Sequence, residues 1–276
     1  MLSHSSPDTL DSLVQYTKIQ EERIESLLES GFQSPEQYDP MITLWRNVWG
    51  KSELCFDATE KIKRDLDKVD DSLIDGVVPN EFNVMILPPG VRRCWGIRCQ
   101  KIFIRPSEYE EAEKAALATS RQEYEGILIT GQPGIGLFIL CFVIAGSESF
   151  LSGKSTFLLR LLLRRLTLSL PTALQTHPNR VMLFHKGGVV EFKHLQSWPF
   201  YSDLGPMPTV DGPPDRLWAL VDSNQELLNP AQILGQGRFF VVHAASPHHS
   251  LQKWVKDSLT LSFYMEPWSF SEVLQA

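Results

Sequence analysis

The feature that most constrains the fold is a glycine-rich turn that directly follows an apolar run. Residues 127–130 read ILIT, and residues 131–136 read GQPGIG. The apolar run predicts a buried strand, and the glycines predict a tight turn whose backbone N–H groups wrap a bound phosphate. This is the first half of a phosphate-binding loop, whose full pattern is GxxxxGK[ST]. The sequence therefore predicts an α/β domain organised around a strand, a turn and a helix.

The second half of this pattern appears 17 residues later than expected. Gly136 is followed by Leu137, and the Lys-Ser-Thr run comes only at residues 154–156. A separate complete motif at this second position would need a glycine where the sequence has Glu148. Removing Leu137 to Gly153 gives GQPGIGKSTFLLRLLLRRL, which is a complete loop that opens an apolar helix.

Two explanations of the interruption stay open, a retained intron and a native inserted loop. The 17 residues correspond to 51 nucleotides, in frame and close to the length of a small intron, and the codons at both borders permit splice sites. The nine apolar residues at 137–145 are too few for a membrane span, which needs roughly 20. We therefore hypothesise a retained intron. We expect 137–153 to form a poorly ordered or awkwardly packed excursion, after which Ser155 begins the helix.

A second motif candidate is the run LWALVD at residues 217–222, which ends in an aspartate. A parallel strand that is buried on both faces ends at the carboxyl edge of its sheet. There an aspartate can complete the shell of a Mg²⁺ ion that is also bound by the hydroxyl of the phosphate-binding loop. We expect Asp222 on the strand adjacent to the Gly131 turn, with its carboxylate close to the Ser155 hydroxyl.

Further apolar runs complete the predicted sheet. Strands are expected near 126–130, 180–185, 217–222, 238–244 and 260–265, with a hairpin partner for the second of them at 189–192. Intervals of about 15 to 50 residues between successive strands suit crossover connections. Helices are expected at 109–122 and 155–169. The predicted fold is thus a mainly parallel sheet with helices on both faces.

The run RFFVVHAA at 238–245 predicts a strand with a histidine near its end and a serine just beyond it. Ser246 or His243 is a candidate for sensing a terminal phosphate. The alternative for His243 is a histidine of the core, with its ring nitrogens satisfied there.

Composition limits the classes of partner. The 26 basic and 33 acidic residues give a net charge of −7, which leaves no electrostatic footprint for nucleic acid. Four cysteines without CxxC spacing indicate neither a zinc site nor a disulfide framework. The amino terminus lacks a signal sequence. We expect an intracellular protein, cytoplasmic or nuclear, that binds nucleotide and no membrane. The sequence does not identify a protein partner.

These motifs, in this order, resemble the P-loop NTPase domain of the Crinkler-type proteins of fungi and oomycetes and of the related trypanosome retrotransposon-hot-spot proteins. The resemblance covers about residues 80–276. It rests on the restored GQPGIGKST, on the lead-in WGIRCQKIFIRPSEY, and on LWALVDS, FFVVHAASP and YMEPWSFSEV. It implies an ATPase with ATP and Mg²⁺ as cofactors. It also implies an additional strand between the Walker A strand, which precedes the glycine-rich turn, and the Walker B strand, which ends in Asp222. Residues 1–80 are predicted to form a helical N-terminal region and residues 81–276 an NTPase domain, interrupted at 137–153 and truncated at its carboxyl end.

The resemblance also implies roles for individual residues. Ser155 and Asp222 would bind the metal, and Asp222 and Ser246 are the candidate catalytic residues. The phosphates would be held by the two halves of the loop, which comprise Gly131, Gln132, Pro133, Gly134, Ile135, Gly136, Gly153, Lys154, Ser155 and Thr156.

The chain departs from the family pattern in three places. The loop is interrupted, no acidic residue directly follows Asp222, and no helical lid follows 260–265. We therefore expect the uninterrupted sequence to bind ATP and the full chain to bind it weakly or not at all. Two functional classes stay open: an NTP hydrolase or nucleotide switch, and a non-catalytic interaction module or remnant whose loop is broken.

Overall fold

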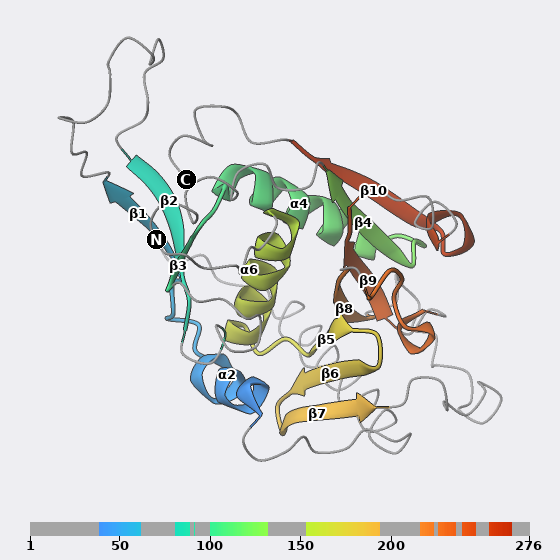
Figure 1. Ribbon diagram of the computed structural model, residues 1–276, viewed down its shortest axis with the longest axis horizontal. Coiled ribbons are helices and arrows are strands. Elements are labelled where there is room, and N and C mark those ends of the chain that lie inside the picture. Colours follow the sequence, from blue (N-terminus) through green and yellow to red (C-terminus); the bar gives the residue numbers. More distant parts are fainter. Residues whose placement is uncertain are drawn as a thin grey trace, which may run out of the picture.

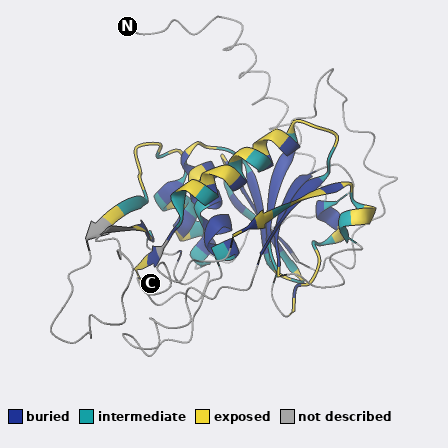
Figure 2. Cartoon of the chain, turned by 90° about the horizontal axis from the view of Figure 1, so that it is seen from above, coloured by how far each residue is buried: buried dark blue, intermediate teal, exposed yellow. Residues whose placement is uncertain are grey.

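The structure is a computed structural model of the chain. It describes residues 39–61, 81–88, 91, 100–131, 153–193, 216–223, 226–235, 239–246 and 254–266. Within those ranges, a seven-stranded sheet is flanked by helices and by a smaller three-stranded sheet (Figure 1). The strands of the large sheet are mostly buried, and exposed residues lie on the outer surface (Figure 2).

The large sheet is mainly parallel. Its strand order is β10-β4-β9-β8-β5-β6-β7. All neighbours from β10 to β5 run parallel, whereas β6 pairs antiparallel with β5 and with β7. The prediction of an α/β fold with a mainly parallel sheet is therefore confirmed. The seven strands are β4 (Gly126–Gly131), β5 (Thr172–His177), β6 (Arg180–His185), β7 (Gly188–Lys193), β8 (Leu217–Asp222), β9 (Phe239–Ala244) and β10 (Thr260–Met265).

The central strands are buried on both faces, which explains their continuous apolar sequences. In β8, Trp218 and Leu220 belong to the core on the helical face of the sheet. Ala219 and Val221 belong to a second core on the opposite face. Successive side chains of a strand point to opposite faces. Both alternating sets of side chains in the run LWALV are therefore removed from water.

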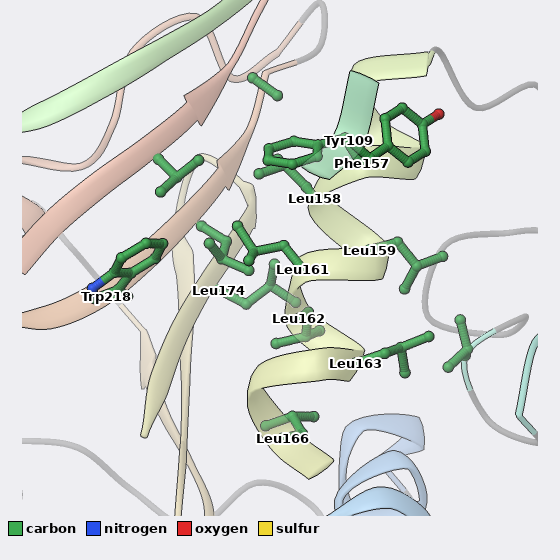
Figure 3. Close-up of a cluster of buried hydrophobic side chains, with 14 of the residues drawn as sticks. Tyr109, Phe157, Leu158, Leu159, Leu161, Leu162, Leu163, Leu166, Leu174 and Trp218 are labelled. Atoms are coloured by element: carbon green, nitrogen blue, oxygen red, sulfur yellow. The ribbon is translucent and has the colours of Figure 1, made fainter. Parts of the chain in front are cut away.

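Helix α6 (Gly153–Thr167) is the centre of the larger core. Its side chains Leu159, Leu162, Leu163 and Leu166 are fully buried, and Figure 3 shows this row of leucines along the helix. Each buried leucine contributes roughly 1.5–3 kcal/mol of transfer free energy. Because α6 contacts β4, β9, β8 and β5, it crosses the middle of the sheet.

Helix α4 (Pro106–Ser120) packs against β4 and β10, beside α6. A proline in its first turn suits the helix start, where the missing N–H has no intrahelical partner. Tyr109 of α4 meets Phe157 of α6 edge to face, with ring centroids 5.8 Å apart (Figure 3). This contact holds the first turn of α6 in place.

The chain before residue 81 also contributes to this core. Helix α2 (Pro40–Val48) is capped by Asp39, which accepts from the Met41 N–H, and its buried Leu44 and Val48 join the α6 cluster. The three-stranded sheet consists of β1 (Asp57–Lys61), β2 (Glu81–Ile86) and β3 (Lys101–Phe103), all antiparallel. The predicted domain boundary at residue 80 stays a prediction, but helix α2 shares the core of the larger sheet.

Two details of the predicted sheet are wrong. Strand β5 was not expected, and it takes the parallel position beside β8. The predicted strand at 180–185 instead forms an antiparallel hairpin with β5 through a turn at residues 178–179, so no crossover connects them. Its expected hairpin partner is confirmed as β7.

Helices on both faces are shown only in part by the described residues. Helices α2, α4 and α6 all contribute to the same core cluster and therefore lie on one face. The other face is covered by the short 3-10 helix η5 (Gln232–Leu234) and by a helical turn at 254–257. In the part of the chain that the structure describes, no helix has the length and apolar character to cross a membrane.

Candidate functional site

The first residues of α6 meet the end of β8 at the carboxyl edge of the sheet. The Ser155 hydroxyl donates to Asp222 Oδ1 over 2.8 Å, although the two residues lie 67 positions apart. The expected closeness of these two side chains is therefore confirmed. The expected adjacency of their strands is wrong, because β9 lies between β4 and β8. Helix α6 bridges this gap, since it crosses β9 as well as β4 and β8.

Lys154 belongs to the second half of the interrupted motif, and its side chain reaches the first half. Its Nζ donates to the Gly131 carbonyl oxygen over 3.2 Å, and only 4% of the residue is exposed. Burial lowers the pKa of Lys154, and the nearby Asp222 carboxylate opposes this effect. A buried ammonium group gains stability from a second anion close by, which a phosphate would supply.

Gly131 is a position that only glycine fits. Its φ of +153° is a backbone conformation that other residues rarely adopt, and an added Cβ would lie 2.6 Å from the Met265 carbonyl oxygen. The close pairing of β10 with β4 thus requires a glycine at the last residue of β4.

The structure describes only some of the other predicted site residues. Gly153 is the first residue of α6, and Thr156 is buried in its first turn. The helix thus begins two residues before the predicted start at Ser155. Ser246 is exposed just beyond the end of β9. Lying outside the described residues are Gln132, Pro133, Gly134, Ile135, Gly136 and the insertion up to Ser152.

His243 lies inside the sheet rather than in the site. The residue is 0% exposed and its ring meets Trp254 edge to face at 4.9 Å. Burial lowers the pKa of His243 to about 3, so the ring is neutral at physiological pH. Its Nε2 lies 2.5 Å from the Ser223 hydroxyl oxygen. His243 is therefore a histidine of the core, which was the alternative prediction. Only its Nε2 is satisfied, because Nδ1 has no hydrogen-bond partner among the described residues.

The site chemistry suits a hard divalent cation. The described residues contain no group of three or more His, Cys, Asp or Glu side chains that would form an all-protein metal site. A serine hydroxyl and a carboxylate are oxygen ligands of the kind that Mg²⁺ prefers, and this ion usually takes its other ligands from water and phosphate. The Ser155 and Asp222 oxygens fit that donor set.

Ser223 is the residue of this region that the sequence reasoning missed. It follows Asp222, and its backbone N–H donates to the Ala244 carbonyl oxygen over 2.9 Å. Its contact with His243 follows from the pairing of Val221 with His243 across β8 and β9. Only this strand register, which the sequence does not reveal, brings the two side chains together.

Comparisons with known proteins found no match for this chain among protein-family models, curated proteins or solved structures. The resemblance to the Crinkler-type NTPase domain stays a prediction that rests on the motifs and their order.

Proposed function

We propose that the chain is a P-loop NTPase domain that binds ATP together with Mg²⁺. The observation that carries this proposal is the hydrogen bond between Ser155 and Asp222 at the carboxyl edge of a mainly parallel sheet. Ligands of open α/β sheets bind at this edge. A serine at the start of a helix and an aspartate at the end of a buried strand are the two side chains that such a site needs for its metal.

The strand order supports the same proposal. Strand β9 separates β4, which leads into the glycine-rich turn, from β8, which ends in Asp222. An additional strand at this place is what the resemblance to the Crinkler-type domain implies. The five strands from β10 to β5 are all parallel, so their carboxyl ends meet at one edge.

The described residues of the site then divide three roles among them. Gly131 ends the strand and opens the loop, Lys154 neutralises terminal phosphate charge, and Ser155 and Asp222 hold the metal. When bound, Mg²⁺ would neutralise phosphate charge. In hydrolysis, a water would attack the γ-phosphate, the bond to the β-phosphate would break with ADP as the leaving group, and the protein would supply mainly positioning. Ser246 beyond β9 stays the candidate for contact with the reacting phosphate.

The metal pair provides the test. Binding of a fluorescent ATP analogue is titrated with and without Mg²⁺, both for the full chain and for a variant that lacks Leu137 to Gly153. Asp222→Asn and Ser155→Ala are expected to remove the Mg²⁺ dependence of binding. Ser262→Ala, which changes an exposed hydroxyl of the edge strand β10, is the control. The proposal is wrong if Mg²⁺ strengthens binding to the same degree in the wild-type protein and in Asp222→Asn.

A non-catalytic interaction module is the second candidate. It is favoured by the 17 residues that separate the halves of the loop, because a phosphate-binding loop needs consecutive N–H groups around the phosphates. Measurement of phosphate release separates the two functions. Release that depends on Lys154 supports the NTPase, whereas a folded chain that neither binds nor hydrolyses ATP supports the module.

A further inference from the structure

A hydroxyl and an imidazole form a pair next to the proposed metal ligands. Ser223 directly follows Asp222, and its Oγ lies 2.5 Å from His243 Nε2. The Ser223 backbone is itself fixed, because its N–H donates to Ala244 at the end of β9. The Ser223 hydroxyl is therefore held at the carboxyl edge, one residue from the carboxylate that meets Ser155.

The surroundings of His243 indicate which nitrogen carries the hydrogen. The ring is neutral, so it has one N–H, and Nδ1 is buried without a hydrogen-bond partner among the described residues. A hydrogen on Nδ1 would leave a buried donor unpaired, whereas a hydrogen on Nε2 is donated to Ser223. Orphaned buried N–H groups are rarer than unpaired acceptors. We therefore assign the hydrogen to Nε2.

This tautomer orients the Ser223 hydroxyl. Its oxygen accepts from His243, so its own hydrogen points away from the imidazole. The Leu228 carbonyl oxygen lies 3.4 Å away, beyond the usual range of roughly 2.5–3.0 Å for an O–H···O bond. The hydroxyl hydrogen is thus available for a stronger acceptor, and a phosphate oxygen is such an acceptor.

We propose that Ser223 donates a hydrogen bond to the terminal phosphate of a bound nucleoside triphosphate, and that His243 positions it. The inference rests on the proposed function, since it names the group that distinguishes a triphosphate from a diphosphate at the same site. Ser223 is half-buried and directly follows the strand that ends in Asp222, whereas Ser246 is exposed two residues beyond the neighbouring strand β9. His243 does not touch the nucleotide, because it lies inside the sheet.

The test compares affinities for ADP and for a non-hydrolysable ATP analogue, both with Mg²⁺. They are measured for the full chain and for the variant that lacks Leu137 to Gly153. Ser223→Ala is expected to weaken binding of the triphosphate about tenfold and to leave ADP binding unchanged, because one hydrogen bond to a charged group is lost. Ser223→Thr, which keeps the hydroxyl, should preserve the triphosphate preference. His243→Phe, which keeps a ring on Trp254, should reduce it.

Each other outcome overturns the inference in a recognisable way. If neither the full chain nor the shortened variant binds any nucleotide, the proposed function fails and the inference fails with it. If Ser223→Ala changes both affinities equally, or neither, nucleotide binding stands and the role of Ser223 is refuted. If Ser246→Ala abolishes the triphosphate preference and Ser223→Ala does not, the contact belongs to Ser246. Thermal unfolding of each variant shows that the fold is retained, and a Ser223→Ala protein that unfolds is replaced in the comparison by Ser223→Cys.

Discussion

Replacing His243 by phenylalanine should change how the stability of the protein depends on pH. Burial lowers the pKa of His243 from 6.5 to about 3. Between these two values the unfolded chain binds a proton at this residue and the folded chain does not. The stability that His243 contributes is therefore fully present above pH 6.5 and is lost as the pH falls towards 3, by about 1.4 kcal/mol per pH unit. Between pH 7.5 and pH 5 the wild-type protein should lose about 2 kcal/mol from this residue alone.

Urea denaturation at pH 7.5, 6.5, 5.5 and 5.0 measures this effect on the wild-type protein and on His243→Phe. At pH 7.5 the variant should be less stable by about 1 kcal/mol, because it loses the hydrogen bond to Ser223. At pH 5 the order should reverse, since only the wild-type protein has lost stability at this position. Titration of the carboxylates is common to both proteins and cancels in the difference. Stability curves that stay parallel over this pH range would show that His243 is not buried in its neutral form.

Three further predictions concern the fold and the insertion. Gly131→Ala should destabilise the protein by about 2–4 kcal/mol in urea denaturation, because the added Cβ would lie 2.6 Å from the Met265 carbonyl oxygen; a loss below 1 kcal/mol would mean that the β4–β10 pairing is not as close as described. Arg165→Met should cost about 1–3 kcal/mol in the same assay, because the buried guanidinium donates to Thr172 Oγ1 and stacks on Trp218 at 4.4 Å; an unchanged free energy of unfolding would refute that contact. Transcripts amplified across 135–155 should lack the 51 nucleotides that encode Leu137 to Gly153, and transcripts that always contain them would instead support a native loop.

The sequence predicts the central strands well, because burial on both faces leaves a clear pattern. The runs that became β4, β8 and β9 contain almost no polar residues before their last positions. The meeting of Ser155 with Asp222 was also predictable. Carboxyl ends of parallel strands lie at one edge, where the first turn of the following helix also lies.

Strand β5 was not predicted because its polar side chains are satisfied by residues outside the strand. Thr172 bonds to Arg165 of α6, and Gln175 accepts from the Ala231 N–H over 2.9 Å. Both residues are 0% exposed. A polar side chain that is paired in this way looks like a surface residue in the sequence. The Ser223–His243 contact was hidden for a related reason, since it depends on the register of two strands.

The most direct test of the proposed nucleotide site is calorimetric titration of the variant that lacks Leu137 to Gly153 with ATP and Mg²⁺. The Nζ of the buried Lys154 already lies 3.2 Å from the Gly131 carbonyl oxygen. Deletion of Leu137 to Gly153 should therefore leave the rest of the fold in place. The shortened protein is expected to bind ATP more tightly than the full chain does, and Lys154→Ala in the shortened protein should abolish the heat of binding. Equal binding with and without Lys154, or no binding by a folded shortened protein, would contradict the proposed site.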